Sequence, residues 1–234
     1  MQPDNHTSKQ FDADLAQIRT RVLLMGGLVE RQLEQALEAL RSGSDMFADR
    51  ILATESDING LEVSIDELCT SLIAKRQPNS VDLRLILAVY KTITDLERIG
   101  DEAKKIGLLT RQVRADRWNL PGISQVRRMG GMVIDMLRRS LDAFSRMDSA
   151  DVPAVVLRDT QVDEEFSALI RTSLSFMLED PRTISAGLDL VFVAKALERM
   201  GDHVKNIAEH TVYAISGTNV RHAGFAELQR VALE

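Results

Sequence analysis

The chain has 234 residues, of which 44% are hydrophobic and 27% charged, and its formal net charge is -6 at pH 7. These values are typical of a soluble globular protein with room for one large domain or two small ones. The acidic balance argues against a protein that coats nucleic acid, and the single cysteine, Cys69, excludes an internal disulfide and a Cys-x-x-Cys zinc site.

The first residues lack the basic and apolar regions of a secretory signal. The longest apolar runs are far shorter than the roughly 20 residues of a membrane span. We therefore expect a cytoplasmic protein.

The sequence contains an internal repeat of helices. Val22–Leu40 aligns with Val126–Phe144, and both segments contain Met-Gly-Gly. In each copy apolar residues recur at steps of three and four, which is the spacing of one face of a helix. Turn signals fall at residues 41–45, 76–80, 119–122, 146–151 and 178–182.

This pattern predicts six helices of about 25 to 33 residues joined by short loops, which make neighbouring helices antiparallel. We therefore expect an all-α fold of two tandem antiparallel three-helix bundles, residues 1–116 and 117–234. Glycine in a helix costs about 1 kcal/mol relative to alanine, so repeated helical glycines suggest close approach of helix backbones. They are Gly26, Gly27, Gly100, Gly130, Gly131 and Gly201.

Paired acids mark the third and sixth predicted helices, in the repeated sequences LERIGD and LERMGD. Glu97 and Asp101 are four residues apart, as are Glu198 and Asp202. Each pair lies on one helix face with roughly 6 Å between its members, where like charges repel unless a cation lies between them.

The preceding helix of each hairpin has polar residues equally far from the predicted turn. They are Asp159 and Asp163 in the second copy and Glu55 and Asn59 in the first. Four oxygen-bearing side chains at one level suit a hard or intermediate cation such as Mg²⁺, Mn²⁺ or iron. We expect tighter binding in the second copy, because all four of its side chains are carboxylates.

The alternative is a solvated helix surface. Lys104, Lys105 and Lys205 lie within helical reach of the acids, and such pairs are common surface features. The repeat and the matched levels favour a metal site. His203 points about 100° away from Asp202 round the helix and is expected at the rim. No Glu-x-x-His pair, phosphate-binding loop or nucleophile motif occurs, so no catalytic residue is predicted.

Several segments together resemble the PhoU family, whose members are accessory proteins of phosphate-specific transport. They are FDADLAQIRTRVLLMGG, LIAKRQPNSVDLR, DLERIGDEAKKI, MLEDPRTI and ALERMGDHVKNIAE, in this order, and the similarity runs from about residue 8 to the end. The resemblance implies two three-helix bundles, in agreement with the repeat.

The resemblance also implies that Glu(Asp)-x-x-x-Asp motifs bind metal ions such as Fe, Zn, Mn or Mg, in some members as multinuclear iron or zinc clusters. Carried over, the motifs are Glu97 with Asp101 and Glu198 with Asp202, supported by Asp159 and Asp163. Asn59 departs from the acid-terminated form, which puts a full first cluster in doubt.

By the same resemblance, the protein is a negative regulator rather than an enzyme. It would link the ATP-binding subunit of the phosphate ABC transporter to a sensor histidine kinase, often as a homodimer, with only indirect membrane association and no nucleic acid. Two other classes stay open at this point: a metal-dependent helical-bundle enzyme and a metal-free structural scaffold.

Overall fold

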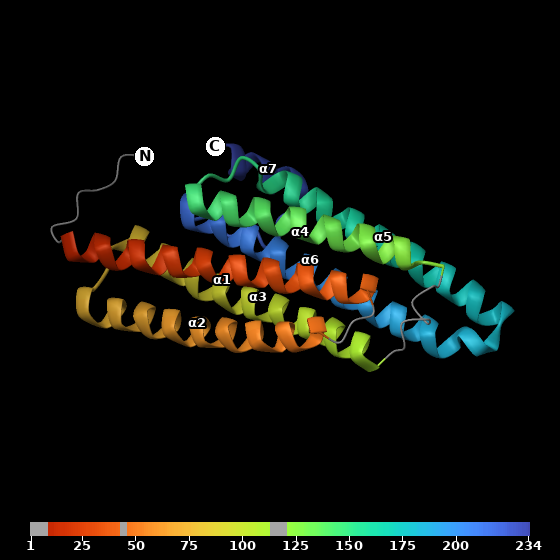
Figure 1. Cartoon of the computed structure of the whole chain (residues 1–234). Helices are drawn as coiled ribbons and strands as arrows, with labels where there is room; N and C mark the ends of the chain where they lie inside the picture. The colour runs from red at the N-terminus through yellow and green to blue at the C-terminus, as the bar shows by residue number, and fades with distance from the viewer. Residues whose placement is uncertain (1–8, 43–45, 113–120) are drawn as a thin grey trace.

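The computed structural model describes residues 9–42, 46–112 and 121–234. The fold is all-α, and its long helices lie roughly along one direction in an elongated molecule (Figure 1). In chain order the helices are α1 (Lys9–Ser42), α2 (Met46–Arg76), α3 (Ser80–Gln112), α4 (Ile123–Arg146), α5 (Val152–Glu179), α6 (Ile184–Ser216) and α7 (Phe225–Leu233). A 3-10 turn, η2 (Pro181–Thr183), precedes α6.

The six predicted long helices and their two bundles are confirmed. Helices α1, α2 and α3 pack on one another, as do α4, α5 and α6. Residues 77–79 join α2 to α3, and Asp180 and η2 join α5 to α6, so each of these pairs forms a hairpin. Asp180 caps η2 by accepting a hydrogen bond from the Arg182 backbone N–H. Helix α7 was not predicted; it packs against α5 and α6 (Figure 1).

The two bundles share one hydrophobic core. Their most extensive contact is between α3 and α6, and α1 also packs against α4. Leu96 and Ile99 of α3 belong to the same buried cluster as Met200 and Val204 of α6. The predicted domain boundary between residues 116 and 117 lies outside the described residues. The two bundles on either side of it pack against each other through α3 with α6 and α1 with α4.

Four glycines of the repeat lie where side chains of another helix approach closely, in place of the predicted approach of helix backbones. A Cβ at Gly26 would lie 2.6 Å from a methyl carbon of Leu141, and one at Gly130 would lie 2.5 Å from a methyl carbon of Leu37. Each bundle thus places a leucine over the other bundle's glycine. The remaining two, Gly100 and Gly201, contact polar side chains described below.

The same prediction is wrong for Gly27 and Gly131. A Cβ at either position would meet nothing within 4 Å. In each Met-Gly-Gly sequence, close packing therefore requires the first glycine alone.

No described helix is both long enough and apolar enough to cross a membrane. Cys69 is 2% exposed, and burial raises the pKa of its thiol to about 11. It is a packing residue of the first bundle's core.

Candidate functional site

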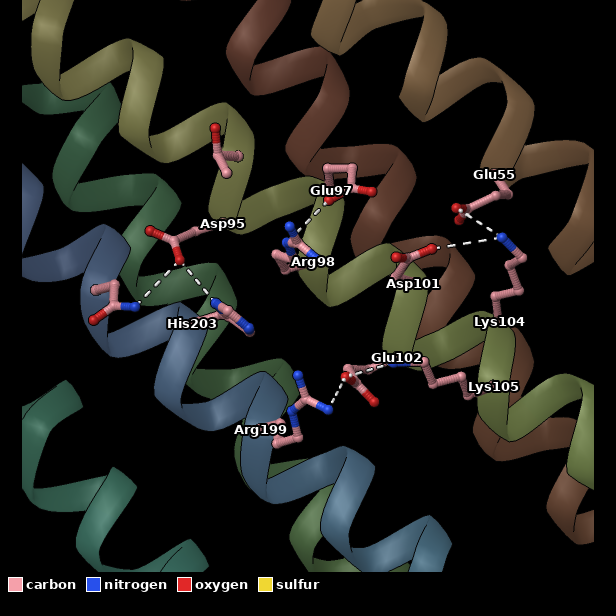
Figure 2. A network of polar contacts seen from close by, with 12 residues as sticks. Glu55, Asp95, Glu97, Arg98, Asp101, Glu102, Lys104, Lys105, Arg199 and His203 are labelled. Atoms are coloured by element: carbon pink, nitrogen blue, oxygen red, sulfur yellow. Dashed lines mark hydrogen bonds and ion pairs between the residues drawn. The ribbon is translucent and has the colours of Figure 1, made fainter.

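The first acidic cluster forms between α2 and α3 around Lys104. Its ammonium Nζ lies 3.5 Å from Oε1 of Glu55 and 3.5 Å from Oδ1 of Asp101 (Figure 2). Glu55 is 5% exposed. Although burial opposes the charged form, the carboxylates of Glu55 and Asp101 raise the pKa of Lys104.

Gly100 and Gln32 position the Glu55 carboxylate. The Gln32 amide donates to Oε2 of Glu55 at 2.9 Å and to the Ile51 carbonyl at 3.1 Å. A Cβ at Gly100 would lie 3.0 Å from Oε1 of Gln32 and 3.4 Å from Oε2 of Glu55. The glycine of the first LERxGD sequence therefore lets these side chains approach α3 closely.

The second cluster repeats this arrangement between α5 and α6. Lys205 donates to Oδ2 of Asp159 at 2.9 Å, and Asp159 is 2% exposed. A Cβ at Gly201 would lie 3.1 Å from Oδ1 of Asp159. That oxygen is buried and has no hydrogen-bond partner in the part of the chain that the structure describes.

The remaining acids of the second cluster interact electrostatically with Asp159 or with one another. Burial and the Asp159 charge raise the pKa of Asp163 and of Asp202. Glu198 adds to the shift of Asp163, although Lys195 binds the Glu198 carboxylate at 2.6 Å. The structure thus brings the four predicted residues of this copy into one electrostatic environment.

In the first cluster, Glu62 adds a carboxylate that the sequence analysis missed. Burial, followed by the charges of Asp101, Glu62 and Glu55, raises the pKa of Glu97. Asn59 is exposed. Glu62 lies seven residues after Glu55 and therefore on the same helix face, a spacing that could have identified it.

The carboxylate oxygens of both clusters are ligands that a hard cation prefers. Several of these carboxylates are instead paired with lysines of the chain itself. No three His, Cys, Asp or Glu side chains among the described residues are placed to hold a metal ion. Lys104 bridges Glu55 and Asp101, and Lys205 binds Asp159, so a metal ion would compete with both lysines. Metal binding by these residues therefore stays a prediction.

A second polar network joins the bundles through Asp95 of α3. Its carboxylate lies 2.8 Å from Nδ1 of His203, 3.0 Å from Nε2 of His210 and 3.2 Å from Nδ2 of Asn206, all on α6. Burial alone would raise the Asp95 pKa, but these hydrogen bonds outweigh it and the pKa is lowered. Because an ionised carboxylate only accepts hydrogen bonds, all three side chains donate.

The prediction that His203 lies at the rim of the acidic cluster is therefore wrong. Its side chain lies between the two bundles, against Asp95. This network was not predicted from the sequence, because the periodicity of one helix does not show which of its faces packs against the other bundle.

A buried acid also joins the bundles farther along α3. Glu102 is 3% exposed, and it binds Nη1 of Arg199 on α6 at 3.1 Å and Nζ of Lys105 at 2.9 Å (Figure 2). Since Asp95 meets Asn206 while Glu102 meets Arg199, α3 and α6 run antiparallel.

Comparisons with known proteins match nearly the whole chain. The family model described as the PhoU domain matches twice, at residues 22–110 and 126–211. A phosphate-specific transport system accessory protein PhoU homolog from Burkholderia sp is 43% identical over 98% of this chain and 99% of its own length. The accessory protein PhoU of Escherichia coli K12 is 40% identical over 97% and 94%.

Two solved structures share the fold. The crystal structure of PhoU from Pseudomonas aeruginosa matches with a TM-score of 0.85 and 40% identity, over 89% of this chain and 100% of that one. The phosphate transport system regulatory protein PhoU from Streptococcus pneumoniae gives a TM-score of 0.83 and 28% identity, over 90% and 99%. Since the two family matches fall on the two copies of the repeat, and the relatives align over almost their full length, this chain belongs to the PhoU family.

Proposed function

We propose that the chain is a regulatory accessory protein of phosphate transport that acts in the cytoplasm. When phosphate is plentiful, it restrains phosphate uptake and keeps the phosphate-starvation response off. The observation that supports this function is the 43% identity over 98% of the chain to a protein named as a phosphate-specific transport accessory protein. The chain works by binding, as a homodimer, rather than by catalysis.

Its partners are the ATP-binding subunit of the phosphate ABC transporter and the sensor histidine kinase of the phosphate response. Contact with the membrane is indirect, through these two proteins. The elongated shape, in which α3 and α6 hold two bundles in one core, suits a rigid connector between two proteins.

The tagged chain, purified from phosphate-replete cells, tests this function. We expect the transporter ATP-binding subunit or the kinase to copurify with it, and deletion of the gene to raise the output of a phosphate-starvation reporter in rich phosphate. A reporter that stays low in the deletion strain would contradict the regulatory role.

Each acidic cluster, in this proposal, also binds a divalent or iron-type cation. Oδ1 of Asp159 is buried and has no hydrogen-bond partner among the described residues, and the charge of Asp159 helps to raise the pKa of Asp163 and of Asp202. Both features support this assignment, because a cation would relieve them. The carboxylates would hold the ion, and the ion would supply the charge that Lys104 and Lys205 supply in this structure.

Elemental analysis of protein purified without chelator tests the metal sites. We expect bound metal in the wild type and its loss from the second bundle in Glu198→Ala/Asp202→Ala. The matched control is Glu227→Ala/Glu234→Ala, which removes two acids that pair with Arg230 on the surface of α7. A wild type without bound metal would contradict the metal sites, and the metal-free structural scaffold would be favoured if it also bound neither partner.

A further inference from the structure

The two ends of the contact between α3 and α6 are related by the repeat but have different chemistry. The positions that carry Asp95 and His210 at one end carry Ala196 and Leu109 at the other. The first end is filled by the hydrogen-bonded Asp95 network. The second end is an open groove with a volume of about 370 Å³.

The floor of this groove, which we call the α3–α6 groove, is apolar and partly exposed. Leu109 and Ala196 line it together with Leu108, which is 37% exposed, and Phe192, which is 58% exposed. Leu188 lies one helical turn before Phe192 and is 45% exposed. Such apolar exposure is unfavourable in water, and a partner that covered it would remove that cost.

The rim of the groove is basic, in a chain whose net charge is -6. Lys105, Lys195 and Arg199 line it, and Glu102 is the one acid among the lining residues. Glu102 is buried and holds Lys105 and Arg199 in place, while Glu198 holds Lys195. A guanidinium has five N–H donors and an ammonium three, so Arg199 and Lys105 keep donors for a further partner, whereas Lys195 is bound by both carboxylate oxygens of Glu198.

We propose that the α3–α6 groove docks an acidic amphipathic helix of a partner protein. Apolar residues on one face of such a helix would cover Phe192 and Leu108, and flanking carboxylates would meet the basic rim, which is the helix-in-groove mode of recognition. A small free anion needs no exposed apolar floor. A second copy of this chain docking by the same face would bring two basic rims together, where like charges repel.

The inference rests on the proposed function for the partner's identity: the helix belongs to the transporter ATP-binding subunit or to the kinase. Two arms of one experiment keep the two ideas apart. The first arm uses a fluorescein-labelled helical peptide with leucines on one face and glutamates on its flanks, and a second peptide with lysine in place of each glutamate. The second arm uses the two purified partner proteins.

The groove variant is Phe192→Ser/Leu108→Ser, which changes two partly exposed side chains of the floor, leaves the ion pairs of Glu102 and Glu198 in place and is expected to fold. Its matched control is Val63→Ser/Leu52→Ser on α2, where the two apolar side chains are 57% and 36% exposed. We expect the wild type and the control to bind the acidic peptide but not the basic one, and the groove variant to bind at least tenfold more weakly. The same loss is expected for a partner protein, with a wild-type association rate that falls as salt increases.

Failure to bind the acidic peptide, or equal binding by the groove variant, would overturn the inference. It would also be overturned if the variant changed only self-association in sedimentation, since the groove would then be a contact between copies. If the wild type bound the peptide at the groove but neither partner protein, the partner assignment would fail and the groove would stand. Partner binding that the groove variant leaves unchanged would reject the groove and keep the function.

Discussion

At the scale of single residues, two buried carboxylates respond to pH in opposite senses. Asp95 has a lowered pKa, so it contributes stability above its unfolded pKa, and this is lost as pH falls through its folded pKa. Glu209 on α6 is 5% exposed, and burial raises its pKa to about 7 against the pull of Lys205 and Arg221. The folded chain therefore binds the Glu209 proton more tightly than the unfolded chain.

Removing the Glu209 charge should stabilise the protein at high pH. Below pH 4.5 both states hold the proton, whereas between 4.5 and about 7 stability falls as pH rises. We expect Glu209→Gln to raise the free energy of unfolding at pH 8 by up to about 3 kcal/mol and to change it little at pH 4. Urea denaturation at pH 4, 6 and 8 measures the difference, and a variant less stable than the wild type at pH 8 would contradict the assignment.

At the scale of elements, the repeated glycines allow the effect of helix packing on stability to be distinguished from the effect of helix propensity. Gly26 and Gly130 lie under leucines of the other bundle, whereas their neighbours Gly27 and Gly131 meet open space. The same substitution at adjacent positions should therefore have opposite effects.

Alanine at the open positions should stabilise the protein. We expect Gly27→Ala and Gly131→Ala each to raise the free energy of unfolding by up to about 1 kcal/mol, because alanine favours the helix and restricts the unfolded chain. Gly26→Ala and Gly130→Ala should lower it by roughly 1–3 kcal/mol, since Leu141 or Leu37 must move. Thermal unfolding of the four variants compares them directly; equal shifts at adjacent positions would argue against the packing.

The elements also show how far sequence reasoning reaches. Apolar steps of three and four are a property of each helix alone, so six long helices in two sets of three were predictable. Matched distances from the turns placed Asp159 and Asp202 at one level. Helix α7 was missed because nine residues without a counterpart in the repeat carry little periodic signal. The sequence suggested that Lys104 and Lys205 pair with acids on a solvated helix surface. Their side chains instead bind acids of the two clusters, through rotamers that depend on tertiary packing.

At the scale of the whole molecule, α3 and α6 determine whether the chain behaves as one unit or two. Their contact is the most extensive in the fold, and it contains Asp95 with its three donors and Glu102 with Arg199. Because both bundles contribute to one core, we expect the wild type to unfold in a single transition.

Breaking the Asp95 network should weaken the joint between the bundles. Asp95→Ala leaves His203 and His210 facing a gap, and we expect a loss of about 3 kcal/mol at neutral pH, with a shoulder or second step in the urea transition. Asp142→Ala is the control, because that exposed acid pairs with Arg146 on its own helix. Circular dichroism with sedimentation follows both variants, and an unchanged midpoint in Asp95→Ala would contradict this role.

The leucine-over-glycine contacts between α1 and α4 are reciprocal. Leu141 covers Gly26 while Leu37 covers Gly130, and the repeat makes the two leucines equivalent and the two glycines equivalent. Each copy of the repeat therefore carries both the leucine and the glycine that are needed to pack against a second copy of itself. The two halves of this chain therefore pack as the subunits of a symmetric dimer would. A half-length ancestor with these residues would have had the contacts to form such a dimer before gene duplication joined its two copies in one chain.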